Sequence, residues 1–470
     1  MKCKPLKRYD NVYNFDFIIK YFSWLIISIL ILLAIFTEES KIALIFAMML
    51  VLSASFLSNQ DILCMWLFLF PFTSLFISRL YISYFIIKYC FLIVLAFRYF
   101  LKIVTKEKKI DFKVLIPLFL YVVYTWCPFL GRVTSLKKLS GTIYNIAIAF
   151  LVYDDKENLD FTHIAMSFVF AMIVSSIFSF FVQYIQAWSN ISGASGSLDR
   201  DTIPKFKGFF EHSNIFMCMD VFALSILVYE LFNKEIKVKY FSICLILLLA
   251  FGYLTFSRNF VLSVIILCVC VFALALTKVK KEYLKYILPA CGLTLVLLFV
   301  IFRFSNLYNI KFKDHYENSW KDYNKNITPE EWELIYAGKL HYDTGRIGLY
   351  YVYFQFFKNN ILRLFVGRGN GFPYIGETHP HNFILDTIYT NGLLGLCIYI
   401  VFLFFIFDIK NIKKYLKNKN YSAFLIVIAY LSTQLINTYF SFIWLMLIIL
   451  CFYDANKKTC LKNNNCFKMN

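Results

Sequence analysis

The chain has 470 residues, of which 60% are hydrophobic and only 16% are charged. A water-soluble domain of this length could not bury so much apolar surface, so the composition excludes an ordinary soluble enzyme. The net charge of +19 does not indicate nucleic-acid binding. The lysines lie in short connections between apolar runs and form no compact basic domain, which favours a role as topology signals.

Apolar runs of about 17 to 25 residues recur along most of the chain, long enough to cross a hydrocarbon layer of about 30 Å as helices. We therefore predict an all-α polytopic membrane protein with about 12 to 14 transmembrane helices. The number depends on whether the sixth run and the last pair cross. The expected spans are residues 17–36, 42–57, 62–77, 82–97, 114–130, 142–152, 163–187, 214–232, 240–256, 260–277, 284–302, 382–407, 421–436 and 442–453.

Lysine and arginine should crowd the cytoplasmic connections, and they concentrate in alternate ones. This pattern predicts that both termini are cytoplasmic and that residues 304–381 form one large external loop. The exceptions are Arg132, Lys137 and Lys138, expected outside, and the acidic residues 154–160, expected inside. We expect three parts: an N-terminal transmembrane bundle (1–303), the external loop (304–381), and C-terminal transmembrane helices with a cytoplasmic tail (382–470).

Two helices are expected within the large loop. Thr328, Pro329 and Glu331 form a capping-box start with proline at the first helical position, and Gly338 is a plausible stop. Residues 346–360 are aromatic and too short to span, so we expect them at the membrane interface or under the loop. None of the thirteen cysteines falls in this loop, so disulfides are not expected to shape it.

The end of the loop holds the most informative motif, a glycine-rich stretch at residues 367–371 followed by 377–382 and by Gly392 and Gly395. A glycine-rich turn lets backbone amides approach a ligand, although a flexible loop tip would have the same composition. The spacing fits neither a Rossmann nor a P-loop motif. His381 lies at the outer end of a predicted helix, which suits a base or a phosphate contact, unless it is only an interfacial histidine facing water.

Three further polar motifs are expected on the external face. Arg258 lies in an almost loopless turn between two spans, where it either has a partner or snorkels to the surface. Arg346 opens the aromatic segment of the loop, where a plain surface arginine is equally plausible. Residues 207–214 lead into another span, and Ser213 or Asn214 could simply cap its helix.

These motifs converge on one face, where arginines and helix N-termini would suit a phosphate or diphosphate. Asp220 and Asp386, inside spans near the outer surface, are alternative bases, and for Asp386 a structural hydrogen bond near Asn382 is as plausible. Lys88 is expected to snorkel or pack.

These motifs resemble the O-antigen ligase and polymerase superfamily, which includes the Wzy repeat-unit polymerases of surface polysaccharides. The resemblance rests on residues 208–214, the Ser257 and Arg258 turn, the Gly345 and Arg346 pair, and the 367–371 turn with the 381–395 stretch. The most specific part is His381, Asn382, a nine-residue gap and the Gly-x-x-Gly of Gly392 and Gly395. The resemblance covers about residues 205–453.

The resemblance implies a GT-C-like helical fold and a metal-independent glycosyltransferase without a cofactor, acting at the outer leaflet on a glycan carried by a polyprenyl diphosphate. Arg258 and Arg346 match arginines expected to hold the diphosphate, and His381 matches the histidine expected at the reacting sugar. The remaining candidates for substrate contact are Arg368, Gly369, His379, Asn382, Lys207, His212 and Asn214.

We therefore predict a polymerase that joins lipid-linked oligosaccharide repeat units into O-antigen or capsular polysaccharide, in the bacterial cytoplasmic (inner) membrane. The nearest alternative is an O-antigen ligase that moves the finished chain to lipopolysaccharide core or another acceptor. A flippase or transporter of lipid-linked sugar is a further alternative, although no paired half-repeats are visible. The last alternative is a noncatalytic protein that assists the assembly of the polysaccharide. Membrane lipid is an expected partner, and the family implies a chain-length regulator and a flippase.

Overall fold

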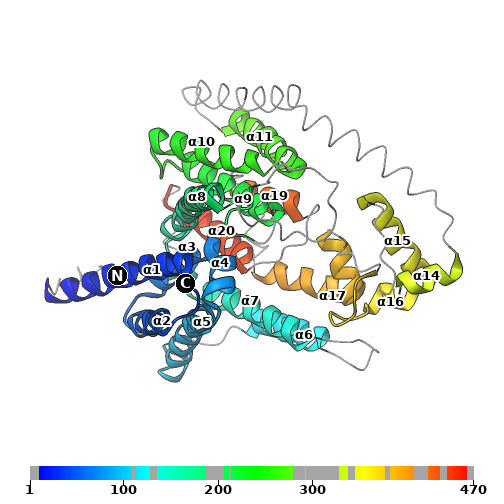
Figure 1. The fold of residues 1–470 in the computed structure, drawn as a ribbon, viewed down its shortest axis with the longest axis horizontal. Coiled ribbons are helices and arrows are strands. Elements are labelled where there is room, and N and C mark those ends of the chain that lie inside the picture. Colours follow the sequence, from blue (N-terminus) through cyan, green and yellow to red (C-terminus); the bar gives the residue numbers. More distant parts are fainter. Residues whose placement is uncertain are drawn as a thin grey trace. The chain divides into compact units, whose positions relative to one another are not determined.

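The computed structural model describes residues 10–107, 112–126, 135–186, 206–210, 213–255, 257–278, 292, 328–336, 345–375, 380, 382–406, 422–434 and 442–462. Within these ranges every regular element is a helix (Figure 1). They are α1 (Asp10–Phe36), α2 (Lys41–Ala54), α3 (Asn59–Leu69), η1 (Phe70–Phe72), α4 (Thr73–Arg79), α5 (Tyr81–Val104), α6 (Phe112–Thr125), α7 (Leu136–Asp155), η3 (Lys156–Asn158), α8 (Phe161–Gln186), α9 (Ser213–Phe232), α10 (Val238–Leu254), α11 (Arg258–Lys278), α14 (Pro329–Tyr336), α15 (Gly345–Asn359), α16 (Ile361–Val366), α17 (Phe383–Ile406), α19 (Ser422–Gln434) and α20 (Phe442–Lys462).

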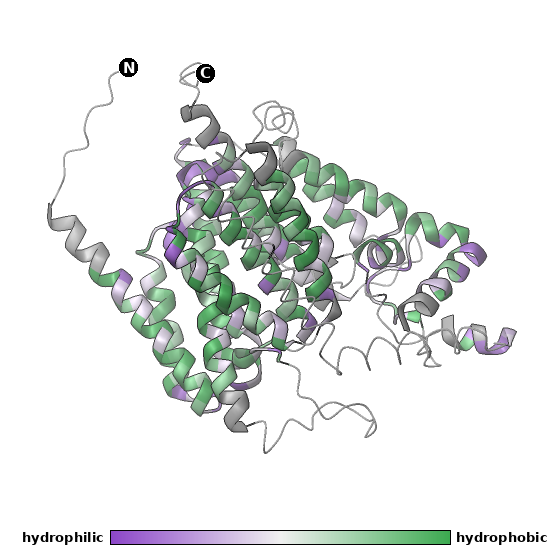
Figure 2. Ribbon diagram, turned by 90° about the horizontal axis from the view of Figure 1, so that it is seen from above, coloured by the Kyte–Doolittle hydropathy of each residue, from purple (hydrophilic) through white to green (hydrophobic). Residues whose placement is uncertain are grey.

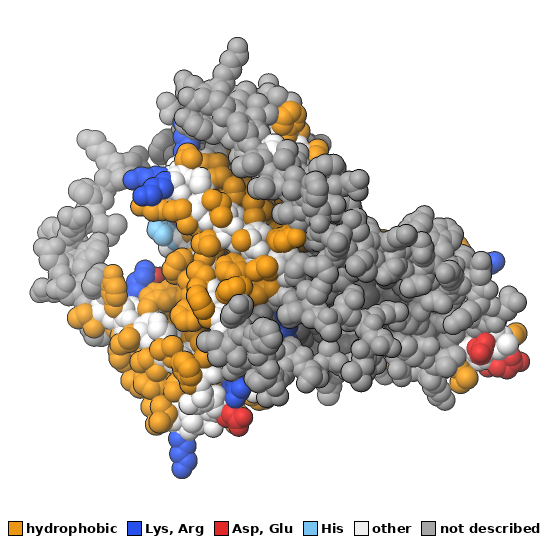
Figure 3. All heavy atoms as spheres, turned by 45° about the horizontal axis from the view of Figure 1, so that its top comes forward, with side chains coloured by type: hydrophobic (Ala, Val, Ile, Leu, Met, Phe, Trp, Pro, Cys, Tyr) orange, Lys and Arg blue, Asp and Glu red, His pale blue; other side chains and the backbone are white. Residues whose placement is uncertain are grey.

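The prediction of an all-α polytopic membrane protein is confirmed. Six described helices are long and apolar enough to cross a membrane: Ile18–Phe36, Asn59–Arg79, Tyr81–Val104, Phe161–Phe181, Ser213–Phe232 and Phe383–Phe404. The hydropathy colouring of Figure 2 shows apolar residues along the helices, and exposed apolar side chains cover a broad surface of the molecule (Figure 3). Such a surface suits contact with lipid rather than with water.

Most of the remaining expected spans coincide with shorter apolar helices. These are Lys41–Ala54, Leu115–Thr125, Val238–Leu254, Asn259–Leu274, Ser422–Thr433 and Ile443–Ala455. The expected span at 142–152 lies within α7, and the expected span at 284–302 lies outside the described residues apart from residue 292. The expected span at 62–77 is interrupted near Pro71, where the 3₁₀ turn η1 separates α3 from α4.

Both helices predicted in the large loop are present. Thr328 and Glu331 form a reciprocal capping box at the start of α14, because each backbone amide donates to the other's side chain, at 2.9 and 3.2 Å. The helix ends at Tyr336, and the stop predicted at Gly338 lies outside the described residues. The aromatic segment forms α15.

The chain packs as two compact units. Unit 1 comprises Met1–Lys109, Asp155–Glu230 and Glu235–Leu254, and unit 2 comprises Ile110–Asp154, Leu231–Lys234 and Thr255–Asn470. In unit 1, α3 packs on α8 and α2 packs on both α1 and α5. In unit 2, α6 and α16 pack on α17, while α19 packs on α11 and α20. The predicted division into an N-terminal bundle, a loop and C-terminal helices differs from these two units and stays a prediction.

A polar network at one end of unit 1 accounts for part of the acidic exception in the charge pattern. Asp155, the last residue of α7, accepts hydrogen bonds from Lys102 Nζ at 3.0 Å and from Asn59 Nδ2 at 2.6 Å. Arg98 Nη1 donates to the Oδ1 atom of Asn59 at 2.9 Å. Basic residues of α5 therefore surround this acidic residue, and the end of α5 lies beside the start of α3. The side of the membrane on which they lie stays a prediction.

Candidate functional site

The most informative local feature of unit 2 is a break inside α17. The sequence predicts a continuous helix at 382–407, but Gly392 has φ 69° and ψ 177°, which interrupts the helical path. A break leaves the preceding carbonyls without helical donors. Two of them accept backbone hydrogen bonds from the glycine-rich turn, Tyr389 O from Arg368 N at 2.8 Å and Thr390 O from Gly369 N at 2.9 Å. The amides of the turn therefore supply the hydrogen bonds that these carbonyls lose at the break in α17.

Two glycines allow this contact because a side chain at either would collide with the opposite backbone. Gly367 has φ 75°, and a Cβ atom there would lie 2.5 Å from Thr390 O and 2.6 Å from Gly392 N. A Cβ atom on Gly392 would collide with the carbonyl of Phe365. The turn is thus a buried packing element and not the loose loop tip that its composition also allowed. Its amides at Arg368 and Gly369 are occupied by protein carbonyls instead of being presented to a ligand.

Tyr124, in α6, joins this arrangement from a distant part of the sequence. Its hydroxyl donates to Asn391 O at 2.9 Å and to Val366 O at 3.2 Å. Its ring partly accounts for the second glycine of the motif, because a Cβ atom on Gly395 would lie 2.8 Å from Tyr124 Cε1 and 2.5 Å from the Cβ atom of Asn391. The sequence analysis missed Tyr124, and no local pattern marks it, since its partners are more than 240 residues away.

Arg368 lies in an aromatic enclosure. Its guanidinium carbon is 4.4 Å from the centre of the Phe372 ring and 5.1 Å from that of Phe356. Arg368 Nη1 donates to the hydroxyl of Tyr389 at 3.2 Å, and that hydroxyl donates to Pro373 O at 2.7 Å. A guanidinium stacked on aromatic faces keeps its charge at a fixed orientation. Arg368 is half-buried, so this charge is held by the protein near its surface.

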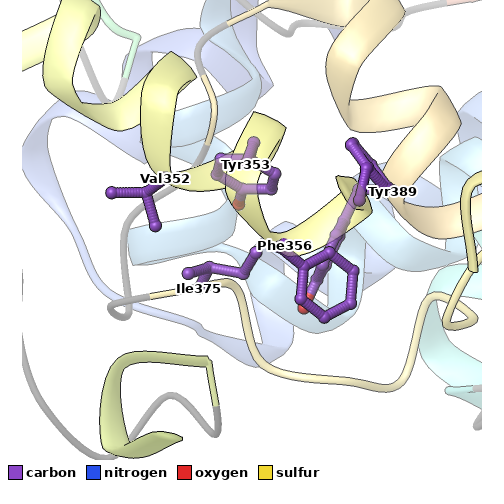
Figure 4. Packing of buried hydrophobic residues seen from close by; sticks show 6 residues of the cluster. Val352, Tyr353, Phe356, Ile375 and Tyr389 are labelled. Carbon is purple, nitrogen blue, oxygen red and sulfur yellow. The ribbon is translucent and has the colours of Figure 1, made fainter. Parts of the chain in front are cut away.

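A buried aromatic cluster supports this enclosure. Figure 4 shows side chains of α15 converging with Ile375, which follows the turn, and with Tyr389 of α17. The Tyr353 and Tyr389 rings meet edge to face, with centroids 5.2 Å apart. The buried members are Val352, Tyr353, Phe356, Phe357, Ile375 and Tyr389. Aromatic side chains on one face of α15 therefore pack in this buried cluster.

The start of α17 is capped by Asn382, whose side-chain oxygen accepts from the backbone amide of Leu385 at 3.1 Å. One turn further, Asp386 is hydrogen bonded to the hydroxyl of Tyr374, and burial together with this carboxylate raises the pKa of Tyr374. This contact is compatible with the structural role anticipated for Asp386, and its alternative role as a base stays a prediction. His379 and His381 lie outside the described residues, as does His212.

The motif at residues 207–214 lies in unit 1. Phe206 N donates to Leu254 O at 3.0 Å, so this stretch lies beside the end of α10, four residues before Arg258. Gly208 has φ 57° and packs under the ring of Phe216. Lys207 is half-buried, and Asn214 is the second residue of α9.

The two arginines of the prediction begin helices, Arg258 at the start of α11 and Arg346 in the first turn of α15. Their side chains lie outside the described residues. Asp220 is fully buried in α9, and neither carboxylate oxygen has a hydrogen-bond partner among the described residues. The structure places Arg368 and Gly369 beside Tyr389 and Thr390, and Asn382 at the start of α17. The role of each in substrate binding stays a prediction.

Residues 243–400 match a family model described as O-Antigen ligase. The match supports the resemblance of this part of the chain to the O-antigen ligase and polymerase superfamily. The matched region runs from within α10 to within α17, and it contains Arg258, Arg346, His381 and the glycine-rich turn. Lys207, His212 and Asn214 precede it. None of the curated proteins compared matches the chain.

Proposed function

We propose that this protein belongs to the O-antigen ligase and polymerase superfamily and is a repeat-unit polymerase of surface polysaccharide. It transfers a growing glycan from a polyprenyl diphosphate to a new lipid-linked repeat unit, without a metal or cofactor. The observation that carries the proposal is the family match over residues 243–400, within which α17 is packed against the glycine-rich turn that fixes Arg368. The reaction takes place on the outer face of the bacterial cytoplasmic membrane, and both termini are cytoplasmic.

The transfer forms one glycosidic bond and breaks one sugar–phosphate bond. The acceptor hydroxyl attacks the first carbon of the donor glycan while the carbon–oxygen bond to the diphosphate breaks. His381 orients this hydroxyl and takes its proton. Arg258 and Arg346 hold the diphosphate and stabilise the charge that develops on it, an effect worth about 3–4 kcal/mol for a single well-placed donor.

The remaining candidates position the lipid-linked substrates. Arg368 and His379 contact the diphosphate or the sugars next to it, with Gly369 and Asn382 at the same end of α17. Lys207, His212 and Asn214 contribute from the stretch before α9. A separate flippase supplies the lipid-linked units, and a chain-length regulator limits the product.

The ligase alternative is favoured by the name of the matching family, O-Antigen ligase. A ligase would use the same diphosphate donor but a different acceptor, such as lipopolysaccharide core, so the same arginines and histidine would serve. The two activities differ in which glycan accumulates when the protein is absent.

A gel of surface glycan from cells lacking the gene tests the proposal. Loss of a polymerase leaves single repeat units attached to the acceptor, which is the result we expect. Polymer stranded on its lipid carrier would identify a ligase. Single units trapped on the cytoplasmic side would identify a flippase, and unchanged glycan would exclude all three activities. Restoring the gene provides the control.

A further inference from the structure

Several large apolar side chains of α15 and α16 are exposed. Phe354 is 65% exposed and lies on the same face of α15 as Tyr351. On α16, Ile361 is 60% exposed and Leu362 is 67% exposed, and Phe365 is also exposed. The opposite face of α15 packs into the aromatic cluster. Five large exposed apolar side chains on two consecutive helices would be unfavourable in water.

Because α16 packs on α17, the position of α17 in the membrane determines the depth of α16. Residues 393–406, beyond the kink, cover about 21 Å at 1.5 Å per residue, whereas the hydrocarbon layer is about 30 Å thick. The charged residue Asp408 marks the edge of the hydrocarbon layer just after the C-terminal end of α17. Hydrocarbon must therefore extend past Gly392 towards Phe383, by about 9 Å for an untilted helix. The end of α16 touches Gly392, so it lies within this layer.

Backbone that leaves a helix at membrane depth must have its polar groups satisfied by protein. The turn after α16 meets this condition. The amide of Gly367 donates to Arg363 O at 2.8 Å, and those of Arg368 and Gly369 donate to α17. Gly367, Gly369 and Asn370 are buried, and the Oδ1 atom of Asn370 accepts from the amide of Ser135 at 2.9 Å. A turn in water would not need this pairing with protein groups.

The charged groups are also placed as a lipid-embedded segment requires. Lys358, Asn359 and Asn360 are exposed together where α15 meets α16, a suitable position for phospholipid headgroups. Arg363 Nη1 turns back to the carbonyl of Gly367 at 3.4 Å. Aromatic rings enclose the guanidinium of Arg368, which shields this charge from acyl chains.

We propose that residues 361–371 form a re-entrant segment in the bilayer leaflet at the Phe383 end of α17. Acyl chains cover Phe354, Ile361, Leu362 and Phe365, and anionic headgroups lie near Lys358. The inference follows from packing and depth alone.

Site-specific fluorescence in vesicles tests the placement. An environment-sensitive fluorescent amino acid is incorporated at residue 362 of the full chain, and quenching by acyl-chain-brominated phospholipids is compared with quenching by aqueous iodide. Leu394, exposed on spanning α17, is the lipid-facing control, and Glu333, exposed on α14, is the aqueous control. A second protein labelled at Phe354 makes the result independent of one variant.

We expect brominated lipid to quench the fluorescence of the probe at residues 362 and 354 more strongly than iodide does, as at Leu394. Iodide quenching like that of Glu333 at both positions would overturn the proposal. Neither reading depends on enzymatic activity, so failure here would leave the polymerase proposal standing.

Discussion

At the scale of single residues, the glycines of this chain have different tasks. Gly367 and Gly392 sit on opposite sides of one backbone contact, and both adopt positive φ values. Gly395 instead makes room for a tyrosine ring. The conformation of Gly392 is one that other residues almost never adopt. Packing thus accounts for both glycines of the Gly-x-x-Gly pattern, Gly392 through its contact with Phe365 and Gly367, and Gly395 through its contact with α6.

Gly392→Ala should destabilise the protein strongly. The unfavourable φ and ψ cost about 1–3 kcal/mol before the collision with Phe365 is relieved. Thermal unfolding in detergent measures the change. Gly141→Ala is the matched control, because nothing lies within 4 Å of a Cβ atom there and the residue is within α7. Alanine at that position should be neutral or stabilising, by up to about 1 kcal/mol. Equal unfolding temperatures for the two variants would contradict the packing described.

At the scale of elements, the hydroxyl of Tyr124 ties α6 to both α17 and the turn. It donates hydrogen bonds to carbonyl oxygens of two segments, those of Val366 and Asn391. Because hydrophobic packing alone would allow these helices to slide, this polar contact gives them a register.

Tyr124→Phe should therefore lower stability by about 1–3 kcal/mol, the usual result when buried acceptors lose their donor. Its ring contact with Gly395 would remain. Tyr81→Phe is the control, since Tyr81 is 58% exposed at the start of α5. Chemical or thermal unfolding of both variants decides the matter, and a Tyr124→Phe protein as stable as the Tyr81→Phe protein would show that the hydroxyl is unimportant.

The network around Asp155 makes a pH-dependent contribution in unit 1. Burial alone would raise the pKa of Asp155, but hydrogen bonds from Asn158, Asn59 and Lys102 outweigh it and hold this pKa below its ordinary value. A lowered folded-state pKa means that the ionised carboxylate stabilises the fold above the unfolded value of about 3.9. This contribution is lost as the pH falls through the lower folded value.

Asp155→Asn should consequently cost about 1–3 kcal/mol at neutral pH. The stability difference from the wild-type protein should shrink below about pH 4. Unfolding curves at several pH values measure it, and Asp154→Asn, which alters the neighbouring carboxylate, is the control. A difference that stayed constant with pH would argue that the loss is steric and not electrostatic.

At the scale of the whole molecule, some features could be predicted from sequence because they depend on local composition. The spans follow from apolar run length, and α14 follows from the spacing of Thr328 and Glu331. The kink at Gly392 could not be distinguished from helix, because a glycine within an apolar run gives no sign of its φ angle. The roles of Tyr124 and of the enclosure around Arg368 depend on residues far apart in the sequence.

The central claim is that this protein makes a glycosidic bond at the expense of a lipid diphosphate. The most direct test is to reconstitute the purified protein with polyprenyl-diphosphate-linked repeat units in the presence of a chelator and to separate the glycans on a gel. We predict a ladder of multiples with release of polyprenyl diphosphate, and none from correctly inserted His381→Ala or Arg258→Ala proteins. A full ladder from these variants would contradict the site assignment, and unjoined repeat units with the wild-type protein would contradict the polymerase itself.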